Sequence, residues 1–164
     1  GLQKKGIDYC GVIYCGLMIT EKGPCVLEYN VRFGDPETEV VLPRMAGGLL
    51  EVLEAATEKL LGKTSVKWNT DAAVDVVIAS GGYPGKYETG YSIKGLDSVP
   101  TNVVIFHAGT RKENDLFITA GGRVLNVVGL GKTIAQARAK AYEKVNAISF
   151  KNMYYRRDIA SFPK

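Results

Sequence analysis

The sequence has little of what disulfide frameworks, metal clusters and membrane spans require. It contains one histidine, His107, and three cysteines, Cys10, Cys15 and Cys25. Three is an odd number and all three lie in apolar strand patterns, so we expect buried, reduced thiols, as in a cytoplasmic protein. Zinc is not expected, because a fourth ligand is missing near the cysteines. The longest apolar stretch, Cys10–Ile19, is too short to cross a bilayer.

The charged residues are also scattered along the sequence rather than clustered. The net charge is +4, with 46% hydrophobic and 23% charged residues in 164 positions, which indicates an ordinary globular protein of one or two domains. This mild charge suits anionic substrates but is too weak and scattered to predict a nucleic-acid partner. We expect no signal peptide, no membrane partner and no nucleic-acid partner.

The most informative stretch begins with the alternating pattern Val26–Val31, which predicts a strand. Glu28 and Asn30 fall on one face of it, about 7 Å apart, and Arg32 joins them if the extended conformation continues. Carboxylate and amide oxygens suit a hard cation such as Mg²⁺, whose coordination is usually completed by phosphates and water. A guanidinium one step further can bind a phosphate or a carboxylate.

A sharp turn follows at Phe33–Glu37. Asp35 is a good N-cap, and Pro36 fits the first position of a helix. Glu37 lies in the first turn, where its charge suits the helix dipole, while the free N–H groups favour an anionic ligand. The alternative interpretation is a plain strand–turn–helix whose acidic residues only cap the helix.

The coarse pattern divides the chain after Ser65. The first part predicts a helix end closed by Gly6, and then strands and helices at Tyr9–Thr20, Val26–Val31, Thr38–Met45 and Leu49–Leu61. The second part predicts the strands Ala72–Ala79, Val103–Ala108, Leu116–Thr119 and Arg123–Gly129, and one long helix, Ile134–Ala147, opened by the capping box Thr133–Gln136. The fold class is α+β.

Several segments resemble phosphate-binding or catalytic motifs but have simpler structural interpretations. Gly129–Thr133 sits where a P-loop would, but Asn126 occupies the position of the required first glycine. Gly62–Thr64 fails for the same reason. Gly81–Gly85 predicts a turn between strands. His107 is a structural hydrogen-bonding residue or a general base, and its apolar strand favours the first.

The run from Arg32 to Glu39, Arg-Phe-Gly-Asp-Pro-Glu-Thr-Glu, resembles the signature of the glycinamide ribonucleotide synthetase family of ATP-grasp enzymes. Four later segments are similar to that family in the same order, namely Ala79–Gly85, Phe106–Thr110, Gly121–Leu125 and Tyr155–Ile159. The resemblance implies that residues 1–65 form the C-terminal part of an ATP-grasp domain and that residues 66–164 form a β-rich accessory domain.

For the parent enzyme of purine biosynthesis, the resemblance implies that glycine is joined to 5-phosphoribosylamine through a glycyl phosphate while ATP is split to ADP. Glu28 and Asn30 would hold Mg²⁺ or Mn²⁺, Arg32 would act as the catalytic cation, and Asp35 and Glu37 would bind substrate. The strand before Glu28 contains no acidic residue, so two protein ligands are expected.

The resemblance covers only the C-terminal portion of such an enzyme. It implies that the remaining domains of the same polypeptide are the main partners, and that these 164 residues alone are nearly inactive. Two alternatives stay open, namely another ATP-grasp carboxylate–amine ligase and a truncated, non-catalytic module that serves in assembly.

Overall fold

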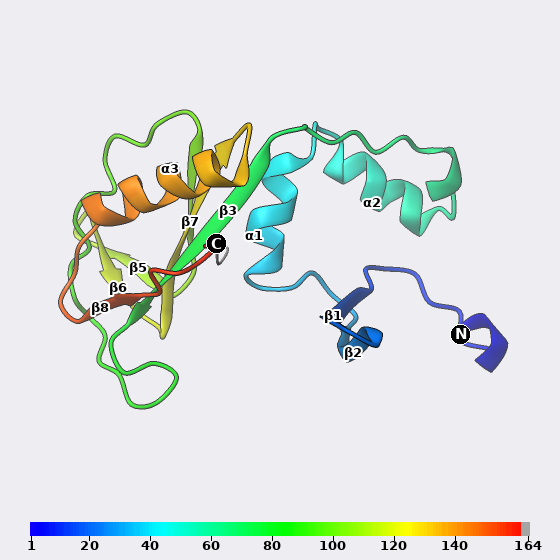
Figure 1. Ribbon diagram of the computed structural model, residues 1–164, viewed down its shortest axis with the longest axis horizontal. Coiled ribbons are helices and arrows are strands. Elements are labelled where there is room, and N and C mark those ends of the chain that lie inside the picture. The colour runs from blue at the N-terminus through cyan, green and yellow to red at the C-terminus, as the bar shows by residue number, and fades with distance from the viewer. Residues whose placement is uncertain (162–164) are drawn as a thin grey trace. The chain divides into compact units, whose positions relative to one another are not determined.

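The computed structural model describes residues 1–161, which form two compact units (Figure 1). Unit 1 comprises Gly1–Thr38 and Met45–Asn69, and unit 2 comprises Glu39–Arg44 and the chain from Thr70 onward. The chain therefore leaves unit 1 for the last time between Asn69 and Thr70. The domain boundary after Ser65 stays a prediction.

Unit 1 is built on an antiparallel hairpin of β1 (Tyr14–Thr20) and β2 (Gly23–Asn30). Its register pairs Gly16 with Glu28 and Tyr14 with Asn30, and shifts after Gly16. The expected strand from Tyr9 begins only at Tyr14. Gly11 lies in the interrupted segment with a φ of 151°, which few other residues adopt.

The short helices of unit 1 are η1 (Gln3–Lys5), α2 (Leu49–Thr57) and η3 (Leu61–Lys63). Gly6 ends η1 in the left-handed conformation, as predicted. Helix α2 stops four residues before the expected Leu61. Lys59 has a left-handed φ of 60°, and the amide of Leu60 bonds the carbonyl of Ala55, which is a Schellman-type ending.

Helix α1 (Glu37–Val41) is followed by the 3-10 turn η2 (Leu42–Arg44). The predicted helix Thr38–Met45 therefore ends early. Pro43 explains this ending, because proline lacks an N–H and disfavours helical geometry at the preceding residue. The helix begins at Glu37, one residue before the predicted start at Thr38 and directly after Pro36.

Unit 2 contains a four-stranded antiparallel sheet in the order β4-β7-β3-β8, with α3 (Ile134–Ala147) covering one face (Figure 1). The strands are β3 (Ala72–Ser80), β4 (Val103–His107), β7 (Arg123–Gly131) and β8 (Met153–Tyr155). A separate hairpin consists of β5 (Thr110–Glu113) and β6 (Leu116–Thr119). The α+β prediction is confirmed, whereas β5 and β8 were not predicted.

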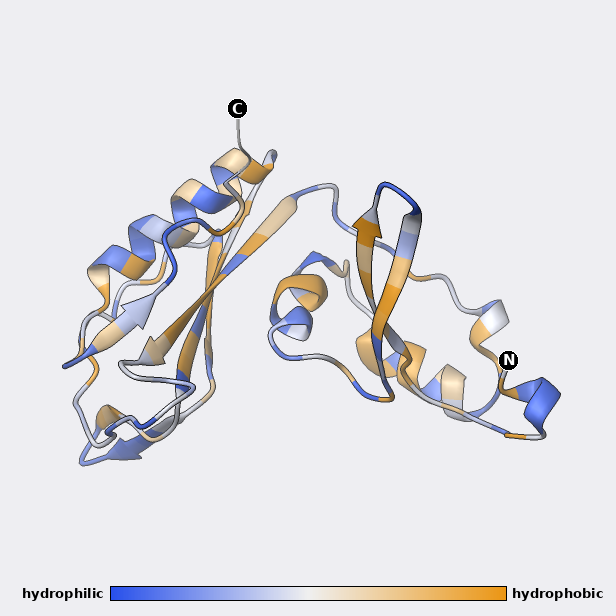
Figure 2. Cartoon of the chain, turned by 60° about the horizontal axis from the view of Figure 1, so that its bottom comes forward, coloured by the Kyte–Doolittle hydropathy of each residue, from blue (hydrophilic) through white to orange (hydrophobic). Residues whose placement is uncertain are grey.

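The hydrophobic core lies in unit 2, between the sheet and α3. Fully buried side chains include Val76, Ile78, Leu125 and Val127 from the strands and Val145 from the helix. Figure 2 shows hydrophobic colour along β3 and β7, and also along the hairpin of unit 1. In that hairpin large apolar side chains are exposed, among them Ile19, Leu27 and Tyr29, at 65–75%.

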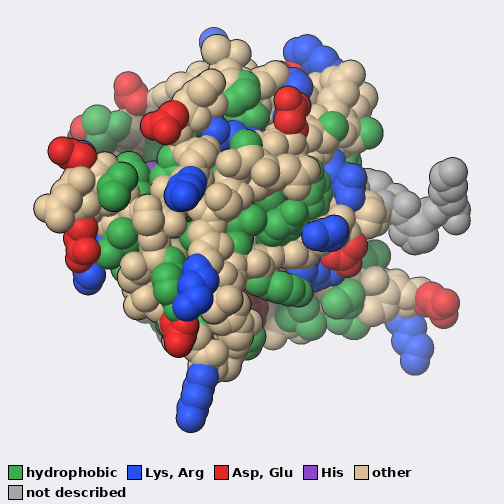
Figure 3. Space-filling model, turned by 90° about the vertical axis from the view of Figure 1, so that its left-hand side faces the viewer, with side chains coloured by type: hydrophobic (Ala, Val, Ile, Leu, Met, Phe, Trp, Pro, Cys, Tyr) green, Lys and Arg blue, Asp and Glu red, His purple; other side chains and the backbone are tan. Residues whose placement is uncertain are grey.

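Cys10, Cys15 and Cys25 are free and exposed, so the prediction of buried thiols is wrong. Alternation correctly indicated strands for Cys15 and Cys25, but it could not show whether anything covers them. In the part of the chain that the structure describes, no helix is long and apolar enough to cross a membrane. On the face in Figure 3, lysine and arginine side chains are interspersed with acidic and hydrophobic ones.

Candidate functional site

The site predicted on β2 centres on Glu28 and Asn30, which share one face of the strand. The side-chain amide of Asn30 donates a hydrogen bond of 2.9 Å to Oε1 of Glu28. This bond holds together two side chains that each carry oxygen donors, the amide of Asn30 and the carboxylate of Glu28. Both are hard oxygen donors of the kind that Mg²⁺ and Mn²⁺ bind.

Across the hairpin from Glu28 lies Gly16, which is buried although it sits in a largely exposed strand. A Cβ at Gly16 would approach Cγ of Glu28 to 3.0 Å, so the absent side chain makes room for the glutamate. The position that could carry a further carboxylate is therefore empty of any side chain. Among the residues described, no three His, Cys, Asp or Glu side chains form a metal-binding group. Sequence reasoning did not identify Gly16, although a glycine within an apolar strand pattern is a known signal of close approach.

Arg32 lies beyond the end of β2, so the strand conformation does not continue to it. Its Nη1 donates to the carbonyl of its neighbour Phe33 at 3.0 Å. The guanidinium is exposed, and its predicted role toward a phosphate or carboxylate stays a prediction.

The turn after Arg32 is held by three bonds to a single residue, Gly34. The carboxylate of Glu37 accepts a hydrogen bond of 3.2 Å from the amide of Gly34. The carbonyl of Gly34 accepts from the amide and from the hydroxyl of Thr38, at 3.0 and 2.5 Å. Glu37 and Thr38 therefore fix the backbone between Arg32 and α1. Asp35 is exposed on this turn. The substrate-binding roles of Asp35 and Glu37 stay predictions, and Thr38 was not singled out from the sequence.

Three glycine-containing segments meet at one end of the unit 2 sheet. Ser80 donates from its hydroxyl to the carbonyl of Gly121 and from its amide to that of Gly122, each at 2.8 Å. Gly109 donates to the carbonyl of Arg123 at 2.8 Å and accepts from Ala120 at 2.7 Å. Side chains at these glycines would collide with the crossing backbone or with Tyr83. Close backbone packing thus explains why these segments are rich in glycine.

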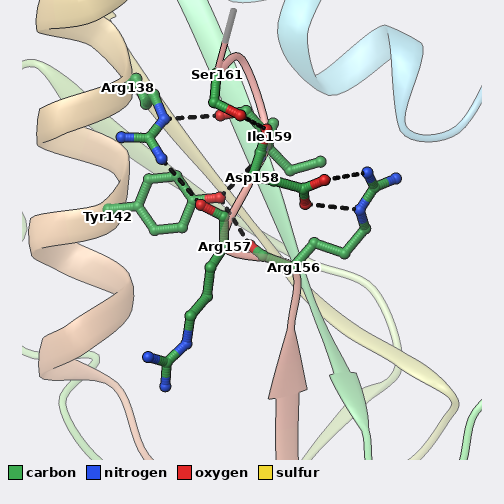
Figure 4. A network of polar contacts seen from close by, with 7 residues as sticks. All are labelled: Arg138, Tyr142, Arg156, Arg157, Asp158, Ile159 and Ser161. Atoms are coloured by element: carbon green, nitrogen blue, oxygen red, sulfur yellow. Dashed lines mark hydrogen bonds and ion pairs between the residues drawn. The ribbon is translucent and has the colours of Figure 1, made fainter. Parts of the chain in front are cut away.

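Tyr155–Ile159, the last of the four segments that resemble the family, is held against α3 by hydrogen bonds (Figure 4). Arg138 donates to the carbonyls of Ile159 and Arg157, both at 2.9 Å. The hydroxyl of Tyr142 donates to the carbonyl of Arg156 at 2.7 Å and accepts from the amide of Ile159 at 3.1 Å. Arg156 forms a two-point ion pair with Asp158, which lowers the pKa of the Asp158 carboxyl.

His107 lies at the end of β4 and its ring packs on Phe117, with centroids 4.3 Å apart. Its Nδ1 is 2.9 Å from the hydroxyl of Thr110. Partial burial of the ring lowers the pKa of His107 below its usual 6.5. These contacts agree with the structural role that its sequence context favoured.

The P-loop-like run is not a loop. Gly129 and Gly131 are part of β7, and a Cβ on either would strike α3 at Ala137. Lys132 pairs with Asp71 at 2.5 Å, and Thr133 caps the helix by accepting from the amide of Gln136. These glycines let the helix approach the strand, and the run does not form the wrapped loop that a P-loop requires.

A hairpin carrying the Glu28–Asn30 pair, followed by an antiparallel α+β unit, agrees with what the resemblance implied, the end of an ATP-grasp domain with its accessory domain. Two family models agree in order along the chain. "Phosphoribosylglycinamide synthetase, ATP-grasp (A) domain" matches residues 1–38, and "Phosphoribosylglycinamide synthetase, C domain" matches residues 73–162. The chain belongs to the phosphoribosylglycinamide synthetase family.

Curated relatives and a crystal structure carry the same enzyme name. Phosphoribosylamine–glycine ligases from Caldanaerobacter subterraneus subsp. tengcongensis and Nostoc sp. are 46% and 51% identical over 98% and 96% of this chain. The crystal structure of the Thermotoga maritima phosphoribosylamine–glycine ligase is 40% identical over 97% of the chain, with a TM-score of 0.82. The chain spans 38% of the length of those two relatives and 39% of the Thermotoga chain.

Proposed function

We propose that this chain supplies the metal-binding hairpin and the accessory domain of an ATP-dependent ligase that joins glycine to 5-phosphoribosylamine. The observation that carries the proposal is the hydrogen-bonded pair of Glu28 and Asn30 opposite Gly16. Relatives that bear the name of this ligase support the choice of substrates. The product, glycinamide ribonucleotide, belongs to purine biosynthesis.

The donor set fits a divalent cation held jointly with nucleotide phosphates. Glu28 and Asn30 offer two oxygen ligands, and Mg²⁺ or Mn²⁺ in ATP-dependent enzymes is commonly held by one or two protein ligands with phosphates and water. When bound, the ion would neutralise charge on the phosphates. The protein's own contribution is to hold both side chains together on one face of β2, with Gly16 of β1 leaving the space for Glu28.

The remaining residues of the signature are proposed to act on the substrates. Arg32 lies two residues before Gly34 and is exposed, and its guanidinium would stabilise the acyl phosphate as it forms. Asp35 is proposed to bind substrate from the same turn. Glu37 already uses one oxygen to hold the amide of Gly34, so its proposed contribution is to fix the turn and, with its other oxygen, to orient substrate.

The rest of the ligase polypeptide is proposed as the partner of unit 1. The hairpin exposes large apolar side chains on both of its faces, including Leu17, Met18, Val26 and Leu27. A concentration of exposed apolar residues favours an interaction surface over a solvated one. We further propose a cytoplasmic location, where the free cysteines would stay reduced.

A chimera would test this function. The matching 39% of the Thermotoga maritima enzyme is replaced by this chain, and release of ADP is measured with and without glycine and phosphoribosylamine. We expect ADP release that depends on both substrates. The Glu28→Gln variant should lose activity by about a hundredfold or more, because a ligand of the catalytic ion is lost.

Glu21→Gln is the matched control, since Glu21 is an exposed glutamate in the turn of the same hairpin. It should retain the activity of the unsubstituted chimera. Activity of Glu28→Gln at the level of this control would remove Glu28 from the metal site. A folded chimera that cleaves ATP with other carboxylate–amine pairs, but not with glycine and phosphoribosylamine, would instead overturn the choice of substrates. A folded chimera that binds no nucleotide would favour the non-catalytic assembly module.

A further inference from the structure

Unit 2 contains a cavity of about 330 Å³ that none of the motifs described above uses. It lies between α3 and the loop that precedes β4. Its wall combines Lys140, Glu143 and Lys144 of the helix with Ser98, Asn102 and Val103 of the loop and strand. Two lysines therefore line one small space.

Lys144 is the unusual member of this wall, because its residue is only 6% exposed. Its ammonium donates to the carbonyls of Asp97 and Ser98, at 3.0 and 3.1 Å. Ser98 adopts a left-handed φ of 54° between these carbonyls, which supports their approach to the same ammonium. An ammonium has three N–H groups, so these two bonds leave one for a ligand.

Lys144 forms no ion pair with an acidic side chain in the described part of the chain. Carbonyl groups satisfy hydrogen bonds but carry no net charge. Buried lysines are almost always paired, because removing an ammonium from water has a large free-energy cost. The buried charge of Lys144 thus lacks the partner that such a charge normally has.

Lys140 lies one helical turn before Lys144 and is half-buried. Its ammonium donates to the carbonyl of Leu130 at 2.8 Å, and it too forms no ion pair within residues 1–161. The three carbonyl contacts of Lys140 and Lys144 hold both positive charges in place, although like charges one turn apart repel each other. Glu143 is exposed and is the only acidic residue on the wall, so the lining has a net charge of +1 from two lysines and one glutamate.

Polar groups without assigned bonds complete the lining. The hydroxyl of Ser98 and the side-chain amide of Asn102 form no side-chain hydrogen bond among the described residues, and both can donate. Pro100, Val103 and Ala147 provide an apolar part of the wall. The volume is at the lower end of the range of small-molecule sites.

We propose that this cavity binds a small metabolite bearing a phosphate or carboxylate group. The anionic group accepts from Lys144 and Lys140, with Ser98 and Asn102 as additional donors, and a small apolar body lies against Val103. Charge-assisted bonds of this kind are about twice as strong as neutral ones. The ligand neutralises the buried ammonium that the protein leaves uncompensated.

Titration of the isotope-labelled 164-residue chain with inorganic phosphate, and separately with acetate, tests the site by NMR. Sodium chloride keeps the ionic strength constant, so that general screening does not change. We expect saturable shifts of the backbone amides of Asn102, Lys140 and Lys144. Saturation by phosphate alone or by acetate alone would identify which of the two anionic groups the site takes.

Lys144→Met should weaken this binding by about tenfold or more, because one charge-assisted hydrogen bond is lost. Lys140→Met should act in the same direction, and it decides the matter if Lys144→Met does not fold. Lys94→Met is the matched control, since Lys94 is an exposed lysine outside the cavity wall. Absence of saturable shifts with both anions would overturn the proposal. Equal anion affinity in Lys140→Met and Lys94→Met would also overturn the proposal. Lys140 and Lys144 would then have only a structural role.

Discussion

Gly16 and Glu28 face each other across the β1–β2 hairpin, and the glutamate side chain occupies the space that a side chain on Gly16 would need. The metal-binding geometry proposed for Glu28 and Asn30 therefore depends on a residue that carries no functional group. This relationship can be tested without changing either ligand.

Gly16→Ala in the chimera should lower kcat/KM for ADP release by about ten- to hundredfold, because small displacements of positioned groups have effects of this size. The added Cβ would lie 3.0 Å from Cγ of Glu28 and displace it. Gly62→Ala is the control, since nothing lies within 4 Å of a Cβ at Gly62. Equal rates for both variants would show that Glu28 tolerates a side chain at Gly16.

Gly129→Ala should destabilise unit 2, because the new methyl group meets the backbone of α3 at Ala137 and Ala141. Overpacking of a tight core costs about 1–3 kcal/mol, and more where backbone must move. Urea unfolding followed by circular dichroism measures the loss. Gly62→Ala should unfold at nearly the same urea concentration as the unsubstituted chain, and a Gly129→Ala curve that coincides with it would contradict this packing.

His107 should titrate below pH 6.5 in the folded chain, because partial burial disfavours its charged form. The unfolded state then binds the proton more readily. The stability that His107 contributes is present above pH 6.5 and is lost as the pH falls through the folded-state pKa. As the chain has one histidine, its ring resonance can be followed by NMR without overlap from another. Phe117→Ala should move the midpoint toward 6.5, and a midpoint above 6.5 in the folded chain would refute the expectation.

Tyr142→Phe should lower the free energy of unfolding by about 1–3 kcal/mol, because it removes one donated and one accepted hydrogen bond. Tyr154→Phe provides the control, since Tyr154 is 57% exposed and its hydroxyl has no hydrogen-bond partner in the described chain. Thermal unfolding of both variants checks the difference. If the two midpoints agree, the clamp in Figure 4 contributes little to stability.

The sequence could predict those features of the fold that depend on residues close together in the chain. The bounds of α3, Ile134–Ala147, are as predicted, because the Thr133 hydroxyl does cap the amide of Gln136. The oxygen pair on β2 was found for a similar reason, since alternation along one strand places Glu28 and Asn30 on the same face.

Features that depend on distant segments were not predicted. Strand β8 exists because Met153–Tyr155 pairs with β3, more than seventy residues earlier, and its short sequence carries no strand pattern. The exposure of Cys15 and Cys25 depends on what covers the hairpin, which alternation within the hairpin does not report. The role of Gly16 required the register, because its importance lies in the residue opposite it.

The uneven distribution of buried side chains has a consequence for ligand affinity. The buried hydrophobic residues of the described chain lie between Val74 and Ile148, so the hairpin with Glu28 and Asn30 contributes none of them. Order in the hairpin then has to come from whatever packs on its apolar faces. If the paired arrangement is populated in only a fraction of molecules, the apparent affinity for the proposed cation falls to that same fraction of its full value. In that case, covering the hairpin would raise the affinity of the proposed metal site without adding a single ligand.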